Sequence, residues 1–161
     1  LDPLAAVVTV VARANVVYEA DFAIHFNLVA NDDRLMYTDG TTDPYSSTCG
    51  GGGGTDCSGT LLGENITNVR TIIGDANFDI GHILTRIYGG VAYLRAVCSS
   101  VKAGGVSGIP RGGDVDPLTA LVVIHEMGHQ FGANHTFSGN ACSGFACLCT
   151  AFDAQQLFSL T

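Results

Sequence analysis

Four residues near the end of the chain's second long apolar segment could hold a metal ion and activate water: His125, Glu126, His129 and His135. On a helix, residues four apart lie one above the other, so the imidazoles of His125 and His129 would point into the same space. Zn²⁺ is bound by convergent nitrogens of this kind, at about 2.0–2.1 Å. Glu126 would point about 100° away, out of reach as a ligand but able to contact a water in the metal's open position. The spacing predicts a zinc site with Glu126 as general base.

Gly132 explains how His135 could be the third ligand. A helix continued past Phe131 would carry position 135 away from the metal, whereas a glycine can take positive φ and turn the chain back. Three histidines and one water leave a position open for catalysis, unlike a closed structural site. Two alternatives stay open: no metal at all, or a structural site whose fourth ligand is one of the cysteines that follow, Cys142, Cys147 and Cys149.

The helix that must carry these residues is predicted from Leu118 to about Phe131. It follows Asp116-Pro117, a capping residue and a proline suited to the first helical position. Asp2-Pro3 repeats this opening, and apolar residues then recur at helical spacing, which predicts another long helix as far as Tyr18. The segment 61–73 is predicted to be helical as well.

Strands and loops complete a predicted α/β (α+β) fold. Alternation of large apolar residues with smaller or polar ones predicts a strand over 21–30. Turn-forming residues predict loops over 38–60 and 103–114, and the five-glycine run 50–54 lacks the Gly-Lys-Ser/Thr of a phosphate-binding loop. Two more strands are predicted over 78–84 and 91–98. At 161 residues the chain is expected to form a single domain, residues 1–161.

Composition excludes several classes of partner. Charged residues make up 14% of the chain, its net charge is −8, and the seven lysines and arginines are scattered singly. Without a basic patch, nucleic acid is not an expected partner. The longest apolar run, 4–11, is about a third of a bilayer span, so no membrane insertion is expected.

Six cysteines without repeated CxxC spacing favour disulfides and an oxidising compartment. We therefore expect a secreted, extracellular protein, with the disulfide pairing left open. His25 and His82 fall outside the zinc pattern, and each is expected to be a hydrogen-bonded or surface histidine rather than a ligand.

The segment HEMGHQFGANH resembles the extended metzincin signature HExxHxxGxxH. Its surroundings, including Asn77–His82, Gly89–Tyr93 and Cys98, resemble the reprolysin (adamalysin-like) branch and its bacterial members. The likeness runs from the first helix to Phe137. It differs at the ends: neither methionine, Met36 nor Met127, follows the motif to form the family's Met-turn, and the strand that precedes the first helix in the family is not present. The resemblance therefore implies a chain truncated at both ends.

The resemblance also implies an architecture and an activity. It implies a metzincin-like fold with two long helices and a twisted mixed sheet, mostly parallel, whose edge strand lies above a cleft floored by the zinc helix. Gly90, Val91 and Ala92 would lie on that edge strand and bind substrate through their backbone. The implied function is a zinc-dependent endopeptidase acting on polypeptide. The alternatives are a zinc-binding but inactive fragment that acts by binding protein, and a zinc hydrolase acting on a non-peptide amide.

Overall fold

The computed structural model describes residues 2–46, 56–85, 89–108 and 117–135, with the backbone alone described at 56–58 and 117–118. Within these ranges the chain forms long helices, short strands and two 3-10 turns. In chain order they are α1 (Pro3–Phe22), η1 (Asp32–Leu35), α2 (Asp56–Ile72), η3 (Asp75–Asn77), β1 (Ile83–Thr85), β2 (Gly90–Ala92), β3 (Gly105–Gly108) and α3 (Pro117–Phe131). The fold is mixed α/β, as predicted.

The first helix begins as the sequence predicts. The side chain of Asp2 accepts a hydrogen bond from the backbone N–H of Leu4, and Pro3 occupies the first helical position. The helix runs one turn further than predicted, to Phe22, and ends where Ala23 takes a left-handed conformation with φ 54°.

The predicted strand over 21–30 is wrong. Residues 21 and 22 belong to α1, and residues 23–29 form no strand. The side chain of Asn15 satisfies the backbone of Phe26 instead, accepting from its N–H at 2.7 Å and donating to its carbonyl at 2.9 Å. The alternation still marks the buried side, because Ile24 and Phe26 pack against the core between α1 and α3.

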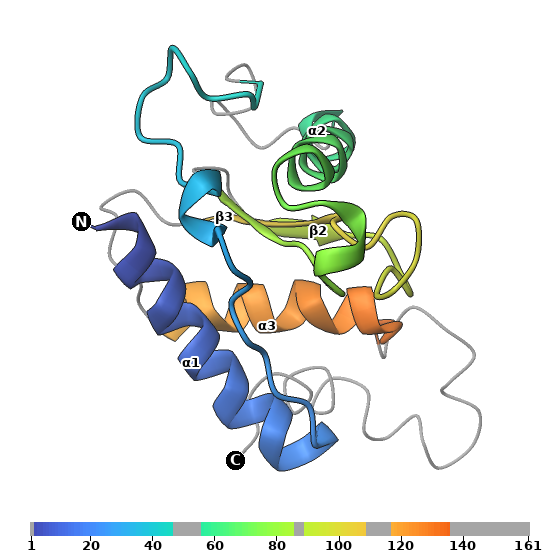
Figure 1. Ribbon diagram of the computed structural model, residues 1–161. Coiled ribbons are helices and arrows are strands. Elements are labelled where there is room, and N and C mark those ends of the chain that lie inside the picture. Colours follow the sequence, from blue (N-terminus) through green and yellow to red (C-terminus); the bar gives the residue numbers. More distant parts are fainter. Residues whose placement is uncertain (1, 47–55, 86–88, 109–116, 136–161) are drawn as a thin grey trace.

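The described strands form one sheet in the order β1-β3-β2. β1 runs parallel to β3, with Ile83 opposite Val106, and β2 runs antiparallel to β3, with Val91 opposite the same residue. The described sheet is thus mixed, as predicted, with one parallel and one antiparallel pairing. Helix α2 covers one face, and α3 and α1 lie on the other (Figure 1).

The strand predictions at 78–84 and 91–98 are largely wrong in extent, and the predicted loop at 103–114 contains the central strand. Only 83–85 and 90–92 are strands in the first two segments, and β3 occupies 105–108. The sequence does not predict β3 because this segment is rich in glycine. The glycines are explained by the crowding around β3, which α2, α3, β1 and β2 all contact. A Cβ at Gly105 would lie 2.4 Å from Gln130 Oε1, so a larger residue there would force the buried Gln130 side chain to move. The predicted loop 38–60 likewise gives way to α2 from Asp56 onward.

Apolar side chains from different elements hold these layers together. Val10, Ala14 and Tyr18 of α1 pack on Val123 and Ile124 of α3. The Tyr18 hydroxyl also donates to the Ile124 carbonyl at 2.9 Å, so the buried phenol is satisfied. On the other face of the sheet, α2 packs on β1 and β3 through Leu61, Leu62, Ile83 and Val106.

By length and composition, α1 is the one described helix that could cross a membrane. Core helices of soluble proteins and signal sequences meet the same criterion, so it assigns no membrane span. In this fold α1 packs against the zinc-motif helix α3 (Figure 1).

Candidate active site

Three imidazoles converge at the C-terminal end of α3. The Nε2 atom of His125 lies 3.1 Å from Nε2 of His129 and 3.0 Å from Nε2 of His135, and the His129–His135 pair is 3.2 Å apart. They are the one group of three potential metal-ligating side chains found in the described part of the chain. The structure therefore brings together the three histidines that the sequence singled out.

This geometry fits a metal ion. Ligands about 2.0–2.1 Å from a tetrahedral zinc are about 3.3–3.4 Å from one another, close to the distances found here. The side chain of His129 is oriented for binding, because its Nδ1 lies 2.7 Å from the Ala133 carbonyl oxygen. A carbonyl only accepts, so Nδ1 carries the hydrogen and the Nε2 lone pair points to the other two rings.

The electrostatics also keep two of the three converging imidazoles unprotonated. Burial, and then the neighbouring His129 and His135, lower the pKa of His125 to about 4. Burial and His129 also lower the pKa of His135. These two rings are therefore neutral at neutral pH, which is the form that ligates a metal.

Gly132 turns the chain so that His135 reaches the other two rings. It has φ 103°, donates to the His129 carbonyl at 2.8 Å, and is followed by Ala133, which donates to Gly128 at 2.9 Å. This pair of hydrogen bonds is a Schellman motif, in which the position of positive φ favours glycine. The predicted helix break at Gly132 is confirmed.

Glu126 lies beside the triad with an unusual environment for a carboxyl. It is 6% exposed, and its Oε2 has no hydrogen-bond partner among the described residues. Burial raises its pKa to about 7. A carboxyl that gains and loses a proton near neutral pH is suited to general acid–base chemistry.

The strand β2 lies at the edge of the described sheet and next to Glu126. Its described partner is β3 alone, and a Cβ at Gly90 would lie 2.6 Å from Glu126 Cγ. Gly90, Val91 and Ala92 are each partly exposed. The structure thus places the predicted substrate-binding strand against the predicted general base, and its binding of substrate stays a prediction.

The two remaining histidines are hydrogen-bonded and do not belong to the converging group. His25 contacts Glu19 on the surface. His82 is bonded through both ring nitrogens, to Gln130 at 2.8 Å and to Ser107 at 2.8 Å. Gln130 was not predicted to matter; its place directly after His129 is the one signal in the sequence that could have drawn attention to it.

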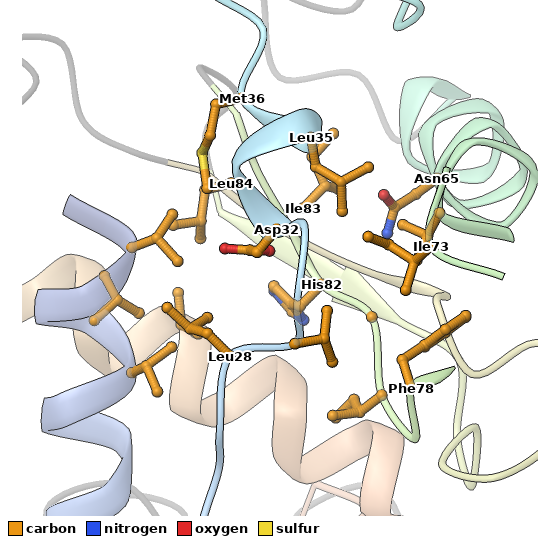
Figure 2. A pocket seen from close by; sticks show the side chains of 18 of the residues that line it. Leu28, Asp32, Leu35, Met36, Asn65, Ile73, Phe78, His82, Ile83 and Leu84 are labelled. Carbon is orange, nitrogen blue, oxygen red and sulfur yellow. The ribbon is translucent and has the colours of Figure 1, made fainter. Parts of the chain in front are cut away.

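A cavity of about 270 Å³ lies between α1, α2 and β1. Figure 2 shows Leu28, Leu84, Asp32 and His82 around it. Its lining includes Val123 and Met127 of α3 but none of the triad, and it is mainly apolar. The chemistry of the triad is therefore separate from this cavity.

The predicted cysteine chemistry lies mostly outside the described residues. Cys98 is exposed, and it is the one cysteine whose side chain the structure describes. The disulfides, and the capping role of Asp116, therefore remain predictions.

A mixed α/β fold whose long helix presents three converging imidazoles beside a buried carboxyl has the features of a metallopeptidase. The chain belongs to the reprolysin-like metallopeptidases of family M12B, whose family profile matches residues 4–136. The predicted reprolysin-like resemblance is confirmed at this level.

Individual relatives match shorter segments. Snake venom metalloproteinase atroxlysin-1 from Bothrops atrox is 30% identical over 59 residues, which cover 37% of this chain and 28% of the relative. Zinc metalloproteinase barnettlysin-1 from Bothrops barnetti is 29% identical over 73 residues, 44% of this chain and 35% of the relative. The chain thus spans less than half of either relative's length. The bacterial-type branch and the truncation stay predictions.

Proposed function

We propose that the chain is the catalytic part of a secreted zinc endopeptidase. His125, His129 and His135 hold the zinc, and Glu126 is the general base. The observation that carries the proposal is the convergence of three Nε2 atoms, 3.0–3.2 Å apart, next to a buried carboxyl whose Oε2 has no partner in the described residues. Two relatives named as metalloproteinases, one of them a zinc metalloproteinase, support the choice of metal and reaction. The venom origin of the first supports secretion.

The chain's own residues supply most of the proposed reaction. The backbone of Gly90, Val91 and Ala92 binds an extended polypeptide as an added strand and holds it over α3. A bound zinc supplies a Lewis acid that polarises the scissile carbonyl and makes water more acidic. Glu126 takes the proton from the attacking water and passes it to the leaving amine. Because water is the nucleophile, no side chain forms a bond to the substrate.

Removing the metal tests the proposal. The purified chain is expected to carry about one zinc and to cleave an unfolded protein such as casein. Treatment with 1,10-phenanthroline should abolish cleavage, and added zinc should restore it. The control is 1,7-phenanthroline, an isomer that cannot chelate. Cleavage that survives chelation would rule out a zinc peptidase, whereas bound zinc without cleavage would support the alternative of an inactive zinc-binding module.

Substitution of Gly90 tests whether β2 and Glu126 act together. In Gly90→Ala the added methyl would lie 2.6 Å from Glu126 Cγ and 2.8 Å from the Val106 carbonyl oxygen. The backbone of β3 cannot yield as a side chain can, so Glu126 is expected to move. Small misplacements of catalytic groups lower reaction rates, so we expect Gly90→Ala to cleave an unfolded protein about ten- to a hundredfold more slowly than the unmodified chain. Its zinc content should be unchanged.

The matched control for this substitution is Gly63→Ala in α2. A Cβ at Gly63 meets nothing within 4 Å, and alanine is the better helix former. Its activity is expected to equal that of the unmodified chain. Full activity in Gly90→Ala would contradict the close coupling of β2 to the general base.

A further inference from the structure

The residue that follows His129 on α3, Gln130, is fully buried and bonded at both ends of its amide. Its Nε2 donates to the carbonyl oxygens of Gly81 at 3.0 Å and Lys102 at 3.2 Å. Because a carbonyl oxygen only accepts, these contacts fix the orientation of the amide. Gln130 Oε1 must then accept from Nδ1 of His82, 2.8 Å away.

His82 carries this chain of hydrogen bonds on to the central strand. With the hydrogen on Nδ1, the neutral ring has a lone pair on Nε2, to which the hydroxyl of Ser107 donates at 2.8 Å. Burial lowers the pKa of His82 to about 4, so the ring stays neutral at neutral pH. Every donor and acceptor in the series of hydrogen bonds that links the Gly81 carbonyl, Gln130, His82 and Ser107 thus has one defined role.

The backbone of β3 passes close to this network at Gly105. A Cβ at Gly105 would lie 2.4 Å from both Gln130 Oε1 and His82 Nδ1. The glycine on β3 therefore makes room for the hydrogen bond between these two side chains.

We propose that His82 is a positioning residue for the zinc centre: through Gln130 it fixes the rotation of α3 at which His125 and His129 meet His135. The proposal rests on the proposed function, because it takes the triad to be the zinc site. His82 lies just before β1, 48 residues from Gln130 along the chain. Within the described residues its ring nitrogens bond to Gln130 and Ser107, and not to the three imidazoles or to Glu126.

Helix geometry explains why the rotation matters. Side chains of an α-helix extend to about 5–6 Å from the helix axis, so a rotation of about 10° moves the Nε2 atoms of the α3 histidines by about 1 Å. Ligand distances in a metal site vary by only about 0.2 Å. His135 lies four residues beyond the end of α3, on the turn at Gly132, so it need not move as one rigid unit with His125 and His129. Gln130, buried one residue from His129, is well placed to prevent that rotation.

Two amide replacements of His82 separate the two ends of the ring. In His82→Asn the amide nitrogen replaces Nδ1 and can still donate to Gln130. In His82→Gln the amide nitrogen lies near the place of Nε2, and the bond to Gln130 is lost. Zinc affinity would be measured by competition with a chelating dye, and the visible absorption of the Co²⁺-loaded chain would report ligand geometry. We expect His82→Gln to bind zinc about 10–100-fold more weakly with an altered Co²⁺ spectrum, and His82→Asn to retain both within about threefold.

The remaining variants make each outcome decisive. Gly105→Ala forces the same hydrogen bond apart without changing a polar group, and we expect it to weaken zinc binding as His82→Gln does. It therefore replaces His82→Gln in the test if the His82→Gln variant does not fold. The exposed His25→Gln is the control and should change nothing. Equal zinc affinity and equal Co²⁺ spectra in both His82 variants would overturn the proposal, even if both melt at lower temperature. A failure of the unmodified chain to bind zinc or Co²⁺ would instead overturn the proposed function.

Discussion

Replacing both His125 and His129 with alanine is expected to abolish zinc binding. The two imidazoles face each other from consecutive turns of α3, with Nε2 atoms 3.1 Å apart. A single remaining nitrogen, from His135, does not hold Zn²⁺ tightly, and each single replacement already leaves only two. Metal content measured by mass spectrometry after purification should fall from about one zinc per chain to none, and peptidase activity should fall with it.

The matched control is alanine at His25, which lies on the surface and contacts Glu19. That variant should keep its full zinc content. Because the triad lies at the end of α3 and is only partly buried, the double variant should retain its far-ultraviolet circular dichroism in the presence of chelator. Full zinc occupancy in the folded double variant would place the metal elsewhere and contradict the site.

The centre of the candidate site could be predicted because its geometry is local. His125 and His129 are one helical turn apart, and Gly132 ends the helix through its own positive φ. These relations lie within α3 and the four residues after it, so they can be read from a short stretch of sequence. The first helix could be predicted for the same reason, since Asp2 and Pro3 define its start within one turn.

The sheet could not be predicted as well, because its strands depend on partners far along the chain. β3 is flanked by β1 and β2, and α2 and α3 cover its faces, so the burial of Val106 and Ser107 outweighs the poor strand preference of glycine. Conversely, the alternation at Ile24 and Phe26 predicts a strand where Asn15 satisfies the backbone instead. Hydrogen bonding across such distances leaves no periodic signal.

The same distinction applies to the catalytic chemistry. The position of Glu126 next to His125 predicts a general base, but its burial and the close approach of Gly90 come from β2 packing on α3. The network of His82, Gln130 and Ser107 has no sequence pattern either, since Ser107 and Gln130 lie 25 and 48 residues from His82 along the chain. Residue types suggest what a side chain can do, and packing decides whether it does so at neutral pH.

Replacing Glu126 with glutamine is expected to stop hydrolysis while zinc remains bound. Glutamine keeps the size of the side chain, so the packing against Gly90 is preserved, but an amide cannot accept a proton from water.

The raised pKa of Glu126, about 7 because of burial, matches a group that takes up and releases a proton during turnover. Loss of a general base typically lowers rates by about 10²–10⁴, and we expect cleavage of an unfolded protein to fall by at least that factor.

Zinc content and cleavage would be measured on the same preparation, with Glu19→Gln on the exposed surface of α1 as the control. Unchanged cleavage would mean that the base is another group, and loss of zinc together with activity would mean that Glu126 supports the metal site instead. The expected result, zinc retained and hydrolysis lost, separates metal binding from proton transfer because Glu126 lies beside the three nitrogens without being one of the converging ligands.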